Sequence, residues 1–328
     1  MYFGGDVYSS ADPFATALGT SDSRVSFIGS DEAALALDPG AIDLGGDFLT
    51  PGFVHSGQVL GAAAPTAAEF WDRGFSHVHV LGPRESVREF AAAAPAGLEV
   101  IAYPEATPEG IASTDDAAAG AAHREGLDGT AVRGVSLSAE AFLDLEAAPT
   151  RAVYVRVASA GQLQTVLDRL GGIRAVAQRH GYRLLLDFSV PTAAVEALGS
   201  CGLAVTLDPD RPQPLAQLLS AGAQVSWTYS QASPWASVRS AVLGDDGISA
   251  RAAFNAATRF AHRAAGNPEG GVLVPGAPAD IVRWKVERLV VQVSDPRVAA
   301  WSTDPRSGTP GLPELSDSVP LPTRVDLD

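Results

Sequence analysis

The sequence predicts an α/β fold: a compact (β/α)8 TIM barrel with a small β-sandwich domain formed from both termini. Three observations lead to this prediction. Between residues 51 and 270, short apolar runs alternate with longer helical patterns, giving eight β-then-α units in about 220 residues. The segments on either side contain short apolar runs separated by Gly, Ser and Asp, which is typical of antiparallel strands. Hydrophobic residues make up 46% of the 328-residue chain, enough for a sizeable core.

The predicted domains follow from the same patterns. The barrel takes residues 51–270, and a composite β-sandwich with a C-terminal tail takes residues 1–50 plus 271–328. Neither end can bury an apolar face alone, so we expect the two ends to pair in one sheet domain. The segment 302–328 contains five prolines among many polar residues, which indicates an extended tail. The strands expected in the two ends are 2–8, 24–29, 41–44, 48–49, 276–284 and 287–293.

The barrel elements are justified by short apolar runs followed by helical periodicity. Expected strands are 53–55, 77–81, 100–103, 132–137, 152–157, 183–188, 204–207 and 224–228. Expected helices include 66–73, 86–94, 162–180 and 211–221. A doubly wound open sheet is the competing fold, but it would need fewer strands. Its dinucleotide-binding form has no support, because no Gly-x-Gly-x-x-Gly follows the first strand.

Charge and cysteine content exclude several classes of function. Acidic residues number 38 against 23 basic ones, giving a net charge of −15, which repels phosphate backbones and anionic lipid. We therefore expect no nucleic-acid partner and no membrane partner. The single cysteine, Cys201, excludes an internal disulfide and a thiolate metal cluster. No signal peptide pattern and no apolar run of about 18 residues is visible, so we expect a cytoplasmic protein.

Several motifs resemble those of the amidohydrolase superfamily, in particular the branch that contains N-substituted formamide deformylases. They occur in the expected order over nearly the whole chain, at 4–8, 24–30, 42–46, 49–54, 233–239, 248–253 and 271–282. The motifs at both ends, such as Leu49-Thr50-Pro51-Gly52-Phe53-Val54, are specific to the superfamily. The resemblance implies a metal-dependent hydrolase barrel, flanked by a β-sandwich made from both termini, with zinc as the expected cofactor.

The same resemblance implies metal ligands that this sequence does not supply. Members with an intact site carry two histidines just after the Pro-Gly-Phe-Val strand, where this chain has Gly57 and Val59. A bridging carboxylated lysine or an equivalent acid is expected at the end of the fourth strand, which matches 133–138 and contains neither a lysine nor an acidic residue. The only lysine, Lys285, lies far away in the sequence.

The later strands depart in the same way. Arg156 stands at the fifth-strand histidine position, and the sixth strand has no histidine in 184–187. The eighth-strand aspartate position falls near Thr228, Tyr229 or Ser230. A zinc site needs three or four converging ligands, so the resemblance implies a degenerate member without a metal cofactor.

Residues that follow the predicted strands are the candidate site residues, because barrel sites lie at the strand ends. They are His55, Arg156, Asp187 and Asp208. We expect Arg156 to contact Asp187 and fill the space that the metal takes in relatives, since a buried guanidinium needs an acidic partner. A relocated metal site is the alternative. His77 and His79 share one face of a strand, with His55 as a third ligand.

Two functions follow from these residues. The first is a non-catalytic binding or assembly scaffold, a pseudoenzyme that forms a homo-oligomer or a hetero-oligomer with an active paralogue. The second is a divergent amidohydrolase that cleaves an amide-like carbon–nitrogen bond, other than a peptide bond, at an unusual or metal-free site. The sequence favours the first, because the core and terminal motifs are kept while the expected ligands are replaced.

Overall fold

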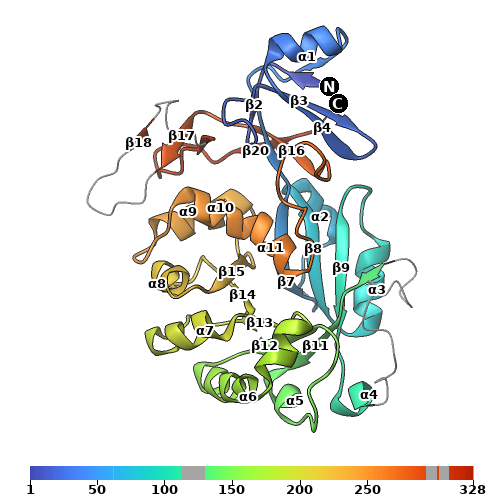
Figure 1. Ribbon diagram of the computed structural model, residues 1–328, viewed down its shortest axis with the longest axis vertical. Coiled ribbons are helices and arrows are strands. Elements are labelled where there is room, and N and C mark those ends of the chain that lie inside the picture. The colour runs from blue at the N-terminus through green and yellow to red at the C-terminus, as the bar shows by residue number, and fades with distance from the viewer. Residues whose placement is uncertain (62, 113–129, 293–300, 303–309, 328) are drawn as a thin grey trace.

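Two parallel β-ladders form the centre of the molecule (Figure 1). The computed structural model describes residues 1–61, 63–112, 130–292, 301–302 and 310–327. The first ladder has the order β10-β9-β8-β7, and the second has the order β11-β12-β13-β14-β15. Their bounds are β7 (Phe53–Val59), β8 (Phe75–Gly82), β9 (Glu99–Pro104), β10 (Ala131–Val132), β11 (Val135–Ser138), β12 (Val153–Val157), β13 (Arg183–Leu186), β14 (Ala204–Leu207) and β15 (Gln224–Trp227).

The predicted α/β class with parallel strands is confirmed, but a closed eight-stranded barrel is not. The ladders meet on one side, where Glu105 forms an isolated parallel bridge with Ser136. On the other side β7 and β15 belong to different ladders and share no strand pairing within the described residues. One cross-link there is a hydrogen bond of 3.4 Å from the Tyr229 N–H to His55 Nε2. The pairing of β7 with β8 has two register shifts, which bend β7 at this edge of the first ladder.

Helices cover the outer faces of both ladders and bury a continuous apolar core against them. They are α2 (Ala67–Asp72), α3 (Arg84–Ala92), α4 (Pro108–Ala112), α5 (Ala139–Leu143), α6 (Ala160–Arg179), η1 (Thr192–Ala194), α7 (Val195–Cys201), α8 (Leu215–Ser220), α9 (Pro234–Leu243), α10 (Ala250–Ala257) and α11 (Arg259–Ala264). The start of α2 is fixed by a capping box between Thr66 and Glu69. The helix expected at 211–221 begins only at Leu215, because Pro212 and Pro214 lack the backbone N–H and disfavour helix in the residue before them.

The two ends of the chain meet in a pair of smaller sheets. One sheet has the order β4-β3-β1-β5, and the other has the order β2-β6-β16-β20. Residues from both sheets, including Leu18, Val25 and Leu49, share one buried cluster with Leu273. Figure 1 shows the N- and C-termini close together at this end. The bounds are β1 (Tyr2–Phe3), β2 (Asp6–Val7), β3 (Ala17–Ser21), β4 (Arg24–Gly29), α1 (Asp31–Leu37), β5 (Ile42–Asp43), β6 (Phe48–Pro51), β16 (Ile281–Lys285) and β20 (Thr323–Val325).

Strand β16 joins the two ends directly. It pairs antiparallel with β6, with Ile281 opposite Pro51 and Trp284 opposite Phe48. A further small sheet contains β17 (Leu289–Gln292), β18 (Trp301–Ser302) and β19 (Leu312–Pro313). The sandwich packing and the domain boundaries stay predictions. In the part of the chain that the structure describes, no helix combines the length and apolar character needed to cross a bilayer.

Candidate functional site

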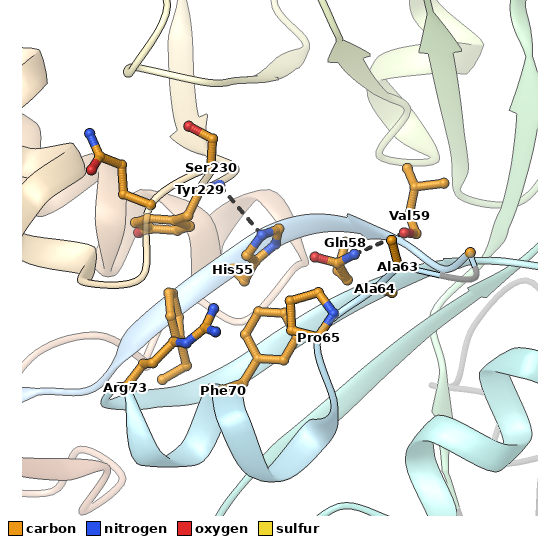
Figure 2. Close-up of a pocket in the computed structure, with 13 residues that line it drawn as sticks. His55, Gln58, Val59, Ala63, Ala64, Pro65, Phe70, Arg73, Tyr229 and Ser230 are labelled. Atoms are coloured by element: carbon orange, nitrogen blue, oxygen red, sulfur yellow. Dashed lines mark hydrogen bonds between the residues drawn. The ribbon is translucent and has the colours of Figure 1, made fainter.

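A β-bulge in β7 decides which way its side chains point. The pairing of β7 with β8 shifts between His55 and Gln58, so Ser56 and Gly57 together take the space of one residue. Gly57 faces the interior between the ladders, because a Cβ there would lie 3.1 Å from both Leu185 and the Tyr154 hydroxyl. His55 points instead toward α2, where its ring meets Phe70 edge-on at 5.2 Å (Figure 2). The bulge therefore turns His55 away from the barrel mouth where it was expected.

A cavity of about 720 Å³ lies beside this turned histidine (Figure 2). That volume is within the range of small-molecule sites. Its walls are half polar and half apolar, and they come from β7, α2, the start of β8 and the loop after β15. The lining residues are His55, Gln58, Val59, Gly61, Ala63, Ala64, Pro65, Phe70, Arg73, Phe75, Tyr229, Ser230 and Gln231.

His55 is a neutral group in this cavity. Burial lowers its pKa from 6.5 to about 3, and the nearby positive charge of Arg73 lowers it further. The Tyr229 N–H donates to Nε2, which also favours the neutral ring. Burial also raises the pKa of Tyr229 well above 10, and its hydroxyl has no hydrogen-bond partner within the described chain. The cavity thus presents an uncharged imidazole beside the guanidinium of Arg73.

The interior between the ladders holds a different cation, Arg183, which is 1% exposed. It begins β13, pairs in register with Tyr154, and lies over that ring at 4.3 Å. Its side-chain nitrogens contact only neutral groups among its hydrogen-bond partners. These are His79 Nδ1 at 3.0 Å, the Ser56 carbonyl at 3.2 Å, and the hydroxyls of Tyr103, Tyr154 and Thr206 at 3.3 Å each.

Sequence reasoning missed Arg183 and assigned the central cation to Arg156. The side chains of Arg156 and Arg183 point to the same side of the second ladder. Arg156 pairs in register with Leu185, and Leu185 packs between the ladders against Tyr154. Arg156 lies two residues further along its strand than Tyr154, near the strand ends, and its side chain is 36% exposed. The signal that could have identified Arg183 is its spacing of two from Leu185, which puts a charge on the inward face of an apolar strand.

The expected contact between Arg156 and Asp187 is replaced by two others. Arg156 pairs with Glu105 at 3.9 Å, and Asp187 pairs with Arg211 at 3.1 Å. Asp187 is exposed, so its ion pair is solvated. Asp208 is buried at the end of β14, where it accepts from the Asp210 N–H at 2.9 Å. Burial raises the pKa of Asp208.

The predicted histidine pair is also divided. His79 contacts Arg183, whereas His77 belongs to a second group with His262 and Asp280. One ligand atom from each of these three lies within 4.8 Å of the others. Burial lowers the pKa of His262 well below 6.5 and raises that of Asp280 above 3.8. His262, which lies in α11, is 0% exposed.

The comparisons with known proteins concern the fold. The sequence matches no protein-family model, and no curated protein matches it significantly. An uncharacterized metal-dependent hydrolase from Pyrococcus furiosus is similar over 86% of this chain and 98% of its own, at 13% identity and a TM-score of 0.62. Atrazine chlorohydrolase TrzN from Arthrobacter aurescens, complexed with zinc, is similar over 92% and 91%, at 18% identity and 0.59. A triazine hydrolase from the same species is similar over 97% and 96%, at 17% identity and 0.60.

These findings correct the expectation that the protein has no metal cofactor. The similar structures are metal-dependent hydrolases, one of them solved with zinc, and this chain places His77, His262 and Asp280 in a possible metal-binding group. The expectation failed because His262 and Asp280 were not considered as ligands, and they are 185 and 203 residues from His77 along the chain. At this level of identity the likeness shows that the chain has the fold of the metal-dependent hydrolases.

Proposed function

We propose that this chain is a divergent hydrolase of the amidohydrolase type, which cleaves a carbon–nitrogen bond in a small amide-like molecule bound beside His55. The observation that carries the proposal is the cavity of about 720 Å³ on the scaffold of a metal-dependent hydrolase. We take N-substituted formamides as the first substrate class, because the sequence motifs resemble that branch. In this proposal the two ladders are a (β/α)8 barrel opened between β7 and β15.

The cavity offers groups for such a reaction. Hydrolysis adds the oxygen of water to the carbonyl carbon, breaks the carbon–nitrogen bond and moves one proton from the water to the leaving nitrogen. His55 is unprotonated near neutral pH and is the group that would carry this proton. Arg73, which lines the same wall, would stabilise the negative charge that develops on the carbonyl oxygen. A base with so low a pKa is weak, so we expect slow turnover.

No step of this proposal runs through a metal at the family position. Gly57 and Val59 stand where relatives have histidines, and neither side chain can donate to a metal. The same observation favours a second candidate function, a scaffold that binds a small molecule or a partner chain without turnover. Both candidates use the His55 cavity, and they differ only in whether product forms.

The experiment measures product and binding together. Purified protein is incubated with a panel of N-substituted formamides, aryl amides and triazines, with product followed by mass spectrometry and binding by titration calorimetry. We expect product from at least one class, and a loss of at least about 10-fold in rate for His55→Gln and Arg73→Gln. His180→Gln, on the surface at the end of α6, is the control and should keep full activity. Binding without product would support the scaffold, and neither binding nor product would contradict both candidates.

A further inference from the structure

We propose that His77, His262 and Asp280, with Glu99 as the fourth ligand, form a structural zinc site that ties the first ladder to the C-terminal strand β16. The site is separate from the His55 cavity and from the family position at Gly57 and Val59. His77 is the third residue of β8 and so lies near the amino end of its strand. The proposal does not depend on the proposed hydrolase function.

The geometry is close to that of a four-ligand site. His77 Nε2 lies 3.1 Å from Glu99 Oε2 and 4.0 Å from Asp280 Oδ2, and the two imidazole rings have centroids 4.3 Å apart. A tetrahedral zinc ion with bonds of about 2.0–2.2 Å places neighbouring ligand atoms about 3.4 Å apart. The ligand atoms of His77, His262 and Asp280 all lie within 4.8 Å of one another, so inward shifts of roughly an ångström would bring them to this spacing. Glu99 contacts His77 Nε2 but lies outside this group of three, so its side chain would have to turn toward the ion to complete the site.

An independent observation points to a missing partner. The Nε2 atom of His262 is buried, and no hydrogen bond to it is formed within the described residues. A buried polar atom without a partner is destabilising, so its persistence in a native core calls for an explanation. A metal ion bound by this nitrogen supplies one. The other ring nitrogen, Nδ1, lies 3.5 Å from Asn267 Nδ2, which is a donor. An ion on Nε2 would place the ring proton on Nδ1, so the Asn267 amide would have to turn its oxygen toward that proton.

The charges and donor types favour zinc among the common ions. Two imidazoles and two carboxylates give a neutral site with a divalent ion, and zinc accepts this mixture of nitrogen and oxygen ligands. The His77 ring is oriented by Ser76 Oγ, 2.9 Å from Nδ1, which can accept the N–H on that side.

The role of the ion follows from where the ligands come from. His77 and Glu99 belong to the adjacent strands β8 and β9, His262 to α11, and Asp280 immediately precedes β16. Four protein ligands would close the coordination, which is typical of structural rather than catalytic zinc. The ion would therefore couple the terminal sheets to the first ladder, since β16 also pairs with β6.

The test uses the full untagged chain, first treated with a chelator and then titrated with zinc chloride. We expect close to one zinc per chain by elemental analysis, a rise in Tm of about 5 °C when zinc is 100-fold above Kd, and a visible absorption band of tetrahedral cobalt when Co²⁺ replaces zinc. Asp280→Asn and Glu99→Gln, which keep side-chain shape, should each lower zinc affinity at least about 10-fold.

The control is His180→Gln, which removes a histidine outside the group and should bind zinc as the native chain does. Because Asp280 and Glu99 are partly exposed, their variants are expected to fold, and circular dichroism checks this. Less than about 0.2 zinc per chain with no change in Tm would overturn the proposal. Native zinc affinity in both carboxamide variants would overturn it as well, because the ion would then bind elsewhere.

Discussion

The interior around Arg183 and the group around His262 bury polar side chains with opposite charge balance. Arg183 brings a full positive charge into the protein, and neutral oxygen and nitrogen atoms surround it. The group of His77, His262 and Asp280 instead gathers carboxylates and imidazole nitrogens. Both regions contain buried nitrogens without a partner among the described residues, which are His262 Nε2 in this group and Arg183 Nε and His79 Nε2 in the interior. In the interior the cation is the Arg183 side chain, whereas in the His77 group the proposed cation is a bound zinc ion.

The difference shows how a hydrolase scaffold can hold a buried positive charge in more than one way. A guanidinium satisfies several acceptors in a plane and lies flat on an aromatic ring, so it needs no carboxylate if enough dipoles face it. In the second group His77 already contacts Glu99, whereas Nε2 of His262 has no hydrogen-bond partner within the described residues, and a cation could satisfy it. Arg183 therefore fills the interior permanently, while the His77 group can gain stability from a bound ion.

The largest effect that can break this comparison is the removal of Arg183. Arg183→Met leaves the Ser56 carbonyl and His79 Nδ1 without a hydrogen bond they now have, and we expect the free energy of unfolding to fall by about 3 kcal/mol. Arg156→Met is the matched control. Its partly exposed ion pair at 3.9 Å should contribute less than about 1 kcal/mol. Urea unfolding measures both, and equal losses in the two variants would show that Arg183 is not the central cation.

The second-largest expected effect is the loss of folding stability at acid pH that arises from His55. Its folded pKa is about 3 and its unfolded pKa is 6.5, so between these values the unfolded chain binds a proton that the folded chain does not. The contribution of His55 to the free energy of unfolding is therefore fully present above pH 6.5 and is lost as the pH falls toward 3. Between pH 7 and pH 5 we expect a loss of about 2 kcal/mol. His79 and His262 act in the same direction.

The measurement compares unfolding at these two pH values in the native chain and in His55→Gln. The variant should lose about 2 kcal/mol of the pH dependence, whereas His180→Gln should keep all of it. A His55→Gln chain with the native pH dependence would mean that His55 is solvated and charged in the folded state.

The smallest expected effect on stability concerns the buried hydroxyls of two tyrosines. The Tyr154 hydroxyl bonds the Ser56 carbonyl at 2.6 Å within the Arg183 network, whereas the Tyr229 hydroxyl beside the cavity has no partner within the described chain. We expect Tyr154→Phe to lower stability by about 1–2 kcal/mol and Tyr229→Phe to leave it unchanged or slightly raised. Thermal unfolding of the two variants decides this, and a loss in Tyr229→Phe would reveal a bond to its hydroxyl.

The sequence allowed the parallel α/β class to be predicted, because strand and helix periodicities are local. Side-chain direction in β7 was not predictable, since the bulge at Ser56 and Gly57 depends on pairing with β8. His262 and Asp280 were missed for a related reason. They are almost 200 residues from His77 in the chain, and only the packing of α11 and the entry to β16 brings them together.

The most direct test of the comparison is a crystal structure of the zinc-loaded protein with anomalous data collected on both sides of the zinc absorption edge. We predict one strong zinc peak between His77, His262 and Asp280, and no zinc peak between Arg183 and the strand ends near Gly57 and Arg156. A peak near Gly57 and Arg156, with none at the His77 group, would contradict the assignment of the two regions.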